Sequence, residues 1–132
     1  MITTTFVDDN KFKSVNEHGN VNNIDMLPAG SKDHMSPTEL LLSSLSACAS
    51  VDLVEMLKKR RKTVVGLTVE ADGLRNEEHP RYFKEITMRF ILNSPDAKME
   101  EFEKMGHMAA TKYCSVAASL SATIHHEFVI NR

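Results

Sequence analysis

The sequence has 132 residues, of which 42% are hydrophobic and 26% charged, with a formal net charge of −2. This length predicts a single domain, residues 1–132, that buries a core without disulfides or a metal. The near-neutral charge excludes wholesale binding of nucleic acid or anionic membranes, and no apolar run approaches the roughly 20 residues of a membrane span. The two cysteines, without a signal-peptide pattern at the N-terminus, indicate a cytoplasmic protein with reduced thiols.

The N-terminal third predicts a small group of strands. Ile2–Val7 alternates in the manner of a strand, and Phe12–Val15 is its predicted partner, with a turn at residues 8–10 between them. Residues 16–35 are rich in Asn, Gly, His and Asp, and we expect turns there around the short apolar patch 24–27.

The longest predicted element is a helix within residues 36–62. Ser36 suits the N-cap, Pro37 the first helical position, and Glu39 completes a capping box. From Leu40 to Leu57 the residues are mostly apolar or small, which predicts a helix buried on nearly all sides. The run KKRRK at 58–62 is interpreted as the helix end, where the dipole favours cations, rather than as a nucleic-acid patch.

The remaining sequence predicts three strands and two helices. In chain order we expect a strand at 64–71, a charged loop at 72–81, a strand at 86–92, a helix opening at Ser94 and Pro95, a short helix at 113–120 and a strand at 122–130. The predicted fold class is α+β, with helices gathered on one side of a largely antiparallel sheet.

Each cysteine has a chemical and a packing interpretation. Cys48 lies in the middle of the long helix, on the same face as Asp52, and free cysteines most often pack as small hydrophobes. If Thr111 caps the short helix, Cys114 falls in its first turn, where backbone N–H groups stabilise a thiolate. The two thiols become an attacking and resolving pair only if their helices meet.

Other chemistries find little support. Glu39 could serve as a base or pair with a cation, although the capping box already explains it. Six histidines are scattered, with no C-x-x-C and no H-x-x-x-H spacing, so we expect no metal. There is also no P-loop, G-x-G-x-x-G or G-x-S-x-G motif, and no cofactor is expected.

Two segments, SPTELLLSSLSACASVDLVEMLKKR and KYCSVAASL, resemble the cysteine-bearing segments of the OsmC/Ohr family. The similar features are a proline eleven residues before Cys48, the small residues SACAS, a second cysteine opening a C-terminal helix, and the stretch HPRYFKEITMRF. The resemblance covers essentially the whole chain. It implies an OsmC-like intertwined homodimer with buried central helices and active sites at the subunit interface.

The same resemblance implies an activity in oxidative-stress defence. In that family pattern Cys48 attacks an organic hydroperoxide or peroxide, Cys114 resolves the product as a disulfide, and a dithiol reductant restores the pair. The chain is most similar to the less characterised branch, in which the helix opens S-P-x-E and an aspartate, here Asp52, follows the cysteine by four. A carboxylate at that position would raise the thiol pKa.

The sequence departs from the better-understood members near the first thiol. Thr38 stands where they have glutamate, Glu39 comes one position later, and no arginine precedes Arg60. The activating cation would then be Lys11, Lys13, Lys32, Arg81 or a residue of the other subunit.

We therefore predict a thiol-dependent peroxide reductase that uses Cys48 and Cys114, supported by Glu39, Asp52 or Arg81. The alternative is a non-enzymatic OsmC-like module that binds an apolar small molecule at the dimer interface, with both cysteines serving as packing residues.

Overall fold

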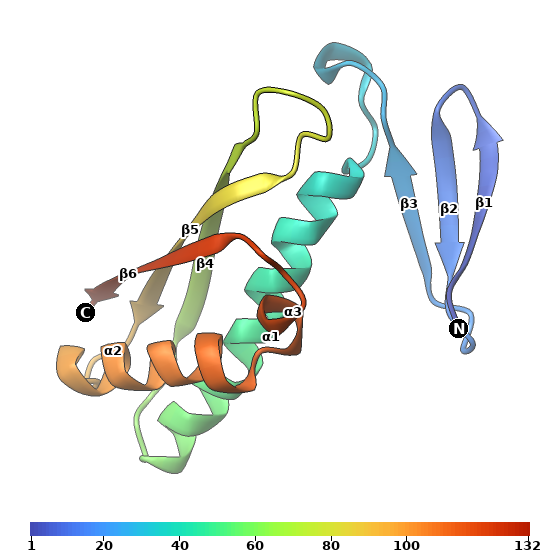
Figure 1. Ribbon diagram of the computed structural model, residues 1–132. Helices are drawn as coiled ribbons and strands as arrows, with labels where there is room; N and C mark the ends of the chain where they lie inside the picture. Colours follow the sequence, from blue (N-terminus) through green and yellow to red (C-terminus); the bar gives the residue numbers. More distant parts are fainter. The chain divides into compact units, whose positions relative to one another are not determined.

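The computed structural model describes all residues from 1 to 132. Their contacts form two compact units, Met1–Leu41 and Leu42–Arg132, and the long helix α1 (Pro37–Lys59) begins in the first and continues in the second (Figure 1).

The first unit contains a three-stranded antiparallel sheet in the order β1 (Thr3–Asp8), β2 (Lys11–Val15), β3 (Val21–Asp25). Asp9 and Asn10 connect β1 to β2 with φ angles of 37° and 62°, values that favour Asp and Asn in two-residue hairpin turns. The first two strands confirm the sequence prediction. β3 lies where turns were expected, because its pairing with β2 outweighs the low strand propensity of its two asparagines.

The ends of α1 follow from its terminal residues. The Ser36 backbone N–H donates to Glu39 Oε1 at 3.1 Å and the Glu39 N–H donates to Ser36 Oγ at 3.3 Å, which confirms the capping box. After Lys59, Arg61 adopts a φ of 60°, and the N–H groups of Arg61 and Lys62 donate to the carbonyls of Lys58 and Leu57. This pattern is a Schellman C-cap.

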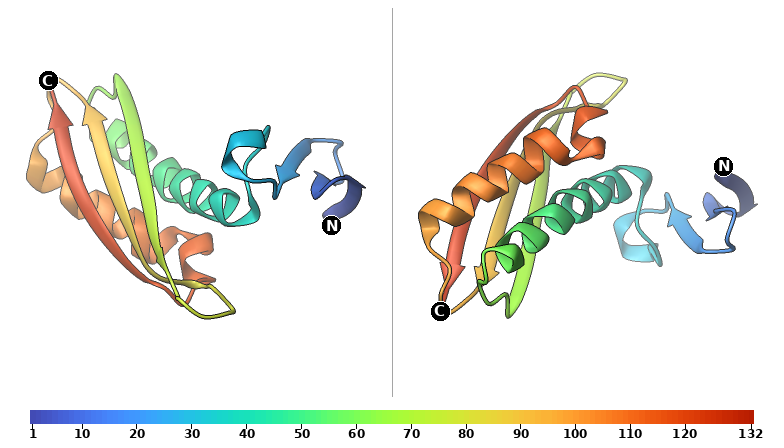
Figure 2. Two further views of the ribbon diagram at one scale, coloured as in Figure 1. Left: turned by 90° about the horizontal axis from the view of Figure 1, so that it is seen from above. Right: turned by 90° about the horizontal axis from the view of Figure 1, so that it is seen from below.

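The second unit is built on a sheet in the order β4 (Gly66–Arg75), β5 (Phe83–Asn93), β6 (Thr123–Asn131). β4 pairs with β5 antiparallel, whereas β5 and β6 run parallel. Between β5 and β6 the chain forms α2 (Met99–Met108), a π-helical turn η2 (Ala109–Tyr113) and the short helix α3 (Ser115–Ala118). Both α1 and α2 lie on the same face of this sheet (Figure 2), as predicted for an α+β fold.

The core of the second unit lies between that sheet face and the two helices. α1 contributes one buried residue per turn to this core: Leu45, Ala49, Leu53 and Leu57. The buried residues opposite them come from β5 and α2: Ile86, Met88, Phe90, Leu92, Phe102 and Met105.

The rest of α1 is not buried within one chain. Val51 is 60% exposed, in contrast to the predicted burial on nearly all sides. By length and composition α1 is also apolar enough to cross a membrane, contrary to the sequence expectation. One such helix is weak evidence for a membrane span, because the core helix of a soluble protein meets the same criterion, and 22% of the apolar window of α1 is buried within the chain.

Candidate active site

The structure brings the two cysteines together in the second unit. Cys48 lies on α1 and is partly exposed, whereas Cys114 is only 2% exposed. Each thiol shifts the pKa of the other, so the two sulfurs are neighbours. The Cys114 thiol also lies 4.0 Å from the Leu45 carbonyl oxygen of α1.

The segment after α2 positions Cys114. Thr111 Oγ1 donates to the His107 carbonyl at 2.6 Å within the π-helical turn, so Thr111 does not cap the next helix as the sequence suggested. Cys114 is itself the N-cap of α3, with φ −77° and ψ 103°. Its sulfur accepts a hydrogen bond from the Ala117 N–H at 3.4 Å.

The first turn of α3 also serves Cys48. The backbone N–H of Val116 favours the Cys48 thiolate and is the main reason that the pKa of this thiol lies below its ordinary value. The Cys114 side chain and the Ser115 N–H act in the same direction, while burial and the Asp52 carboxylate oppose them. The helix N-terminus therefore stabilises the thiolate of Cys48, whereas the sequence prediction had assigned that role at Cys114.

Cys114 has the opposite protonation preference. Burial raises the pKa of its thiol, and the neighbouring Cys48 raises it further, while the Ala117 and Val116 N–H groups oppose these effects. Cys48 is thus the partly exposed sulfur with the lowered pKa, and Cys114 is the buried sulfur with the raised pKa.

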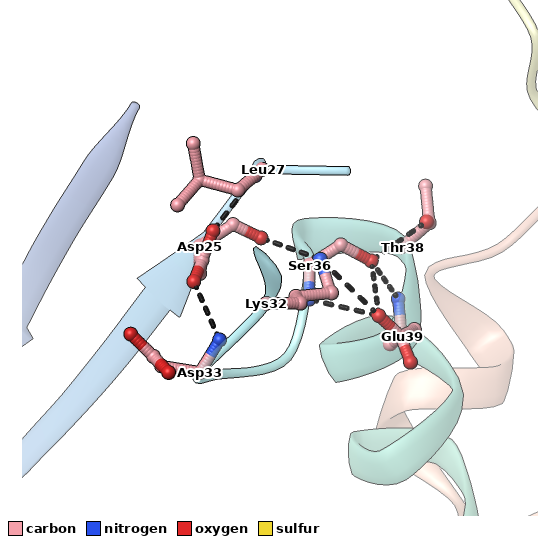
Figure 3. A network of polar contacts seen from close by, with 7 residues as sticks. All are labelled: Asp25, Leu27, Lys32, Asp33, Ser36, Thr38 and Glu39. Carbon is pink, nitrogen blue, oxygen red and sulfur yellow. Dashed lines mark hydrogen bonds and ion pairs between the residues drawn. The ribbon is translucent and has the colours of Figure 1, made fainter. Parts of the chain in front are cut away.

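The predicted supporting residue Glu39 lies in the first unit, within a polar network (Figure 3). Lys32 Nζ lies 3.5 Å from Glu39 Oε1 and donates to the Asp25 carbonyl at 2.6 Å. Hydrogen bonds from the Ser36 N–H and hydroxyl, with a smaller contribution from Lys32, lower the pKa of Glu39. The buried Asp25 carboxylate accepts from the N–H groups of Leu27 and Asp33, which fixes the turn before α1.

The other two predicted supporting residues differ in placement. Asp52 lies one turn after Cys48 on α1, and its charge acts on the Cys48 thiol. Arg81 lies in the loop between β4 and β5, where its Nε donates to the Asn76 carbonyl at 3.3 Å.

Two features of the site had no sequence signal strong enough to identify them. One is the pair of backbone N–H groups from α3, which only the fold places beside Cys48. The other is a groove of about 630 Å³ between α1 and the α2–η2 segment, lined by Asp52, Glu55, Met56, Lys59, Arg60, Lys104, Met105, Met108 and Tyr113. No group of three or more His, Cys, Asp or Glu side chains is arranged to hold a metal ion.

Comparison with known proteins places the chain in a family. A family model described as OsmC-like protein matches residues 30–129. Protein YhfA of Escherichia coli (strain K12) is 36% identical over 90 residues, which cover 68% of this chain and 67% of that protein.

Solved structures share the fold. The OsmC like protein from Mycoplasma pneumoniae matches with a TM-score of 0.85 at 20% identity, covering 100% of this chain and 96% of that chain. The organic hydroperoxide resistance protein OhrB of Bacillus subtilis matches with a TM-score of 0.64 at 14% identity, covering 99% and 96%. The family-model match and the identity to YhfA together show that the chain belongs to the OsmC-like protein family.

Proposed function

We propose that this protein reduces organic hydroperoxides through Cys48 and Cys114. The observation that carries the proposal is the asymmetry of two neighbouring thiols: Cys48 is partly exposed with a lowered pKa, and Cys114 is buried with a raised one. The fold shared with OhrB, a protein of organic hydroperoxide resistance, supports an oxidative-stress role. The reaction would take place in the reducing cytoplasm.

In the first step the Cys48 thiolate attacks the terminal oxygen of the hydroperoxide. The O–O bond breaks, the alkoxide leaves and takes a proton from water, and Cys48 becomes a sulfenic acid. The N–H groups of Val116 and Ser115 favour the thiolate that this step requires. The lowered Cys48 pKa therefore increases the reactive fraction at neutral pH.

The second step uses the buried thiol. Once Cys48 is a neutral sulfenic acid, its negative charge no longer raises the pKa of Cys114, and the Val116 N–H, which interacts with both sulfurs, can favour a Cys114 thiolate. That thiolate attacks the Cys48 sulfur, hydroxide leaves and is protonated to water, and a disulfide forms. A dithiol reductant then restores both thiols.

The test is stopped-flow oxidation of the reduced protein by cumene hydroperoxide and by hydrogen peroxide. We expect fast oxidation of the wild type, faster with the organic peroxide, and no fast phase in Cys48→Ser. Cys114→Ser should keep the first phase and stop at a sulfenic acid that dimedone traps. Equal, slow rates in all three proteins would reject the proposal, and thiols that react with DTNB only after unfolding would assign them to packing.

We also propose that two copies of the chain form the active protein. Asp25 is the only buried residue in the first unit, and the exposed apolar residues of this unit include Ile2, which precedes β1, and Phe6 and Val21 of its sheet. α1 exposes Val51 in the second unit. Apolar surface of this extent is best covered by a partner, and the homodimer implied by the family resemblance would supply one.

A further inference from the structure

The peptide N–H groups that lower the pKa of Cys48 belong to α3, a helix with little stability of its own. α3 has only four residues, Ser115–Ala118, and none of them is buried. A single helical turn does not persist in water by itself, because forming it fixes several backbone angles for each hydrogen bond gained. The position of α3 beside Cys48 must therefore be imposed by the chain around it.

Close packing does not hold α3 on the side that carries its alanines. Ala117 and Ala118 line a hollow of about 250 Å³, which is also lined by Ile124 and His126 of β6 and by Thr111 of η2. A well-packed interface would leave no such space between these elements. The constraint on α3 has to come from another part of its surroundings.

The turn that precedes α3 supplies such a constraint. η2 is π-helical, so its hydrogen bonds span five residues instead of the four of α2, and it leads directly into the extended backbone of Cys114. The Thr111 hydroxyl donates to the His107 carbonyl at 2.6 Å. Because His107 belongs to α2 and Thr111 to η2, this bond spans the junction between the two elements. It therefore restrains the direction in which the chain enters Cys114.

The place of the Thr111 hydrogen bond, rather than its kind, makes it notable. Hydroxyls often donate to the carbonyl four residues earlier in a helix, and Ser50 of α1 does so to Ser46 at 2.7 Å. Thr111 differs because the chain reaches Cys114 only three residues later and then forms the first turn of α3. A change in this turn would move both the buried thiol and the N–H groups that favour the Cys48 thiolate.

We propose that Thr111 is a positioning residue of the thiol site: its hydroxyl fixes the π-helical turn that presents Cys114 and the first turn of α3 to Cys48. Thr111 acts through the backbone and takes no part in the chemistry itself. The inference rests on Cys48 being the nucleophile of the proposed function, but it does not require reaction with peroxide.

The test is the pH profile of Cys48 alkylation by iodoacetamide in Thr111→Val and Thr111→Ser, followed by mass spectrometry. Valine keeps the shape of threonine without the hydroxyl, whereas serine keeps the hydroxyl. In Thr111→Val the α3 N–H groups lose their alignment with Cys48, so its pKa should rise. Alkylation below that pKa should slow by roughly two- to fivefold, as expected when hydrogen bonds to the thiolate weaken, and the rates should converge well above it.

Thr111→Ser should restore the wild-type profile. Cys114 and Asp52, the other titratable groups that act on Cys48, are unchanged in both variants, so a shift is assigned to the turn. A serine variant that behaves like the valine variant would overturn the proposal, because the hydroxyl would then have no role.

Ser50→Ala is the matched control, because it removes a hydroxyl bond of the same kind from α1, two residues after Cys48. Urea unfolding should show similar, small losses of stability in Ser50→Ala and Thr111→Val, since each loses one side-chain hydrogen bond. Only Thr111→Val should shift the alkylation profile. A Thr111→Val protein that loses stability but keeps the wild-type profile would assign Thr111 a merely structural role and overturn the proposal.

Single-turnover oxidation by cumene hydroperoxide separates this inference from the proposed function. If the wild type reacts and the Thr111→Val profile is unshifted, the peroxide assignment stands and the positioning role is rejected. If the wild type is inert towards peroxide and Thr111→Val still shifts the profile, the positioning role stands and the peroxide assignment is lost.

Discussion

Peptide N–H groups within the chain lower the pKa of Cys48. The Val116 and Ser115 N–H groups and the Cys114 thiol lower its pKa, and no lysine or arginine is among the strongest influences. The resemblance implies an activating arginine in the N-terminal strand region of the better-understood members, and this chain has no arginine before Arg60. The first turn of α3 provides a stabilising environment for the thiolate without that arginine.

The effect of Asp52 gives a pH-dependent prediction. Its carboxylate raises the Cys48 pKa, so Asp52→Asn should lower that pKa and keep Cys48 ionised to a lower pH. Alkylation of Cys48 by iodoacetamide, followed by mass spectrometry, should then be faster than in the wild type at pH values below the wild-type pKa of Cys48, and the two rates should converge at pH values well above it.

Glu103→Gln, at an exposed position of α2, is the control for loss of one negative charge. It should leave the alkylation profile of Cys48 unchanged. An unshifted profile in Asp52→Asn would contradict the electrostatic role of that carboxylate.

A backbone substitution tests the amide contribution directly. Ser115→Pro removes one N–H that donates to Cys48, and proline suits the first position of α3 after the extended Cys114. The Cys48 pKa should rise modestly, so alkylation at neutral pH slows by a small factor. Ser115→Ala keeps the N–H and should match the wild type; identical behaviour of the two variants would argue against the hydrogen bond.

The sequence allows the reactive residues to be predicted, but it does not show how they are activated. Cys48, Cys114 and Asp52 could be chosen from residue type and helix position. The hydrogen bonds from Val116 and Ser115 could not, because backbone N–H groups are the same in every residue and only the folded path of the chain directs them. The expectation that α3 would stabilise Cys114 was therefore wrong about which thiol is favoured.

At the scale of elements, α2 packs on β6 through a glycine. A Cβ atom at Gly106 would overlap the ring of Phe128, which stacks on Phe90 at 5.2 Å and meets Phe102 edge-on at 5.1 Å. We predict that Gly106→Ala destabilises the protein by about 1–3 kcal/mol, because the ring or the helix must shift. Urea unfolding measures this free energy.

Gly30→Ala is the control, because no atom lies within 4 Å of the added methyl group. It should change the unfolding free energy by much less than Gly106→Ala. Equal effects of the two substitutions would show that α2 does not approach β6 as closely as described.

Element type was predictable wherever hydrophobic periodicity is strong, as in α1 and β5. It was not predictable for β3, in which Val21 and Ile24 are the only large apolar residues and pairing with β2 decides the conformation. The parallel pairing of β5 with β6 could not be predicted from the sequence either. The alternation of apolar and polar residues shows which face of a strand is buried, but it does not show which strand lies beside it or in which direction that strand runs.

At the scale of the whole molecule, exposed apolar surface predicts self-association. Sedimentation equilibrium should give twice the mass of one chain. Val51→Lys places a charge on the exposed side of α1, and we expect it to shift the protein towards the monomer. Thr68→Lys, on the exposed side of β4, is the control and should leave the mass unchanged. A wild-type protein that remains monomeric at high concentration would contradict the proposed dimer.

The central claim concerns the covalent bond between the two sulfurs. The most direct measurement is intact-mass and peptide mapping of the reduced protein after one equivalent of cumene hydroperoxide. The account predicts the loss of two hydrogen atoms and a peptide pair joined through Cys48 and Cys114. A product that gains oxygen at Cys48 while Cys114 remains a free thiol, or a protein that stays unmodified, would contradict it.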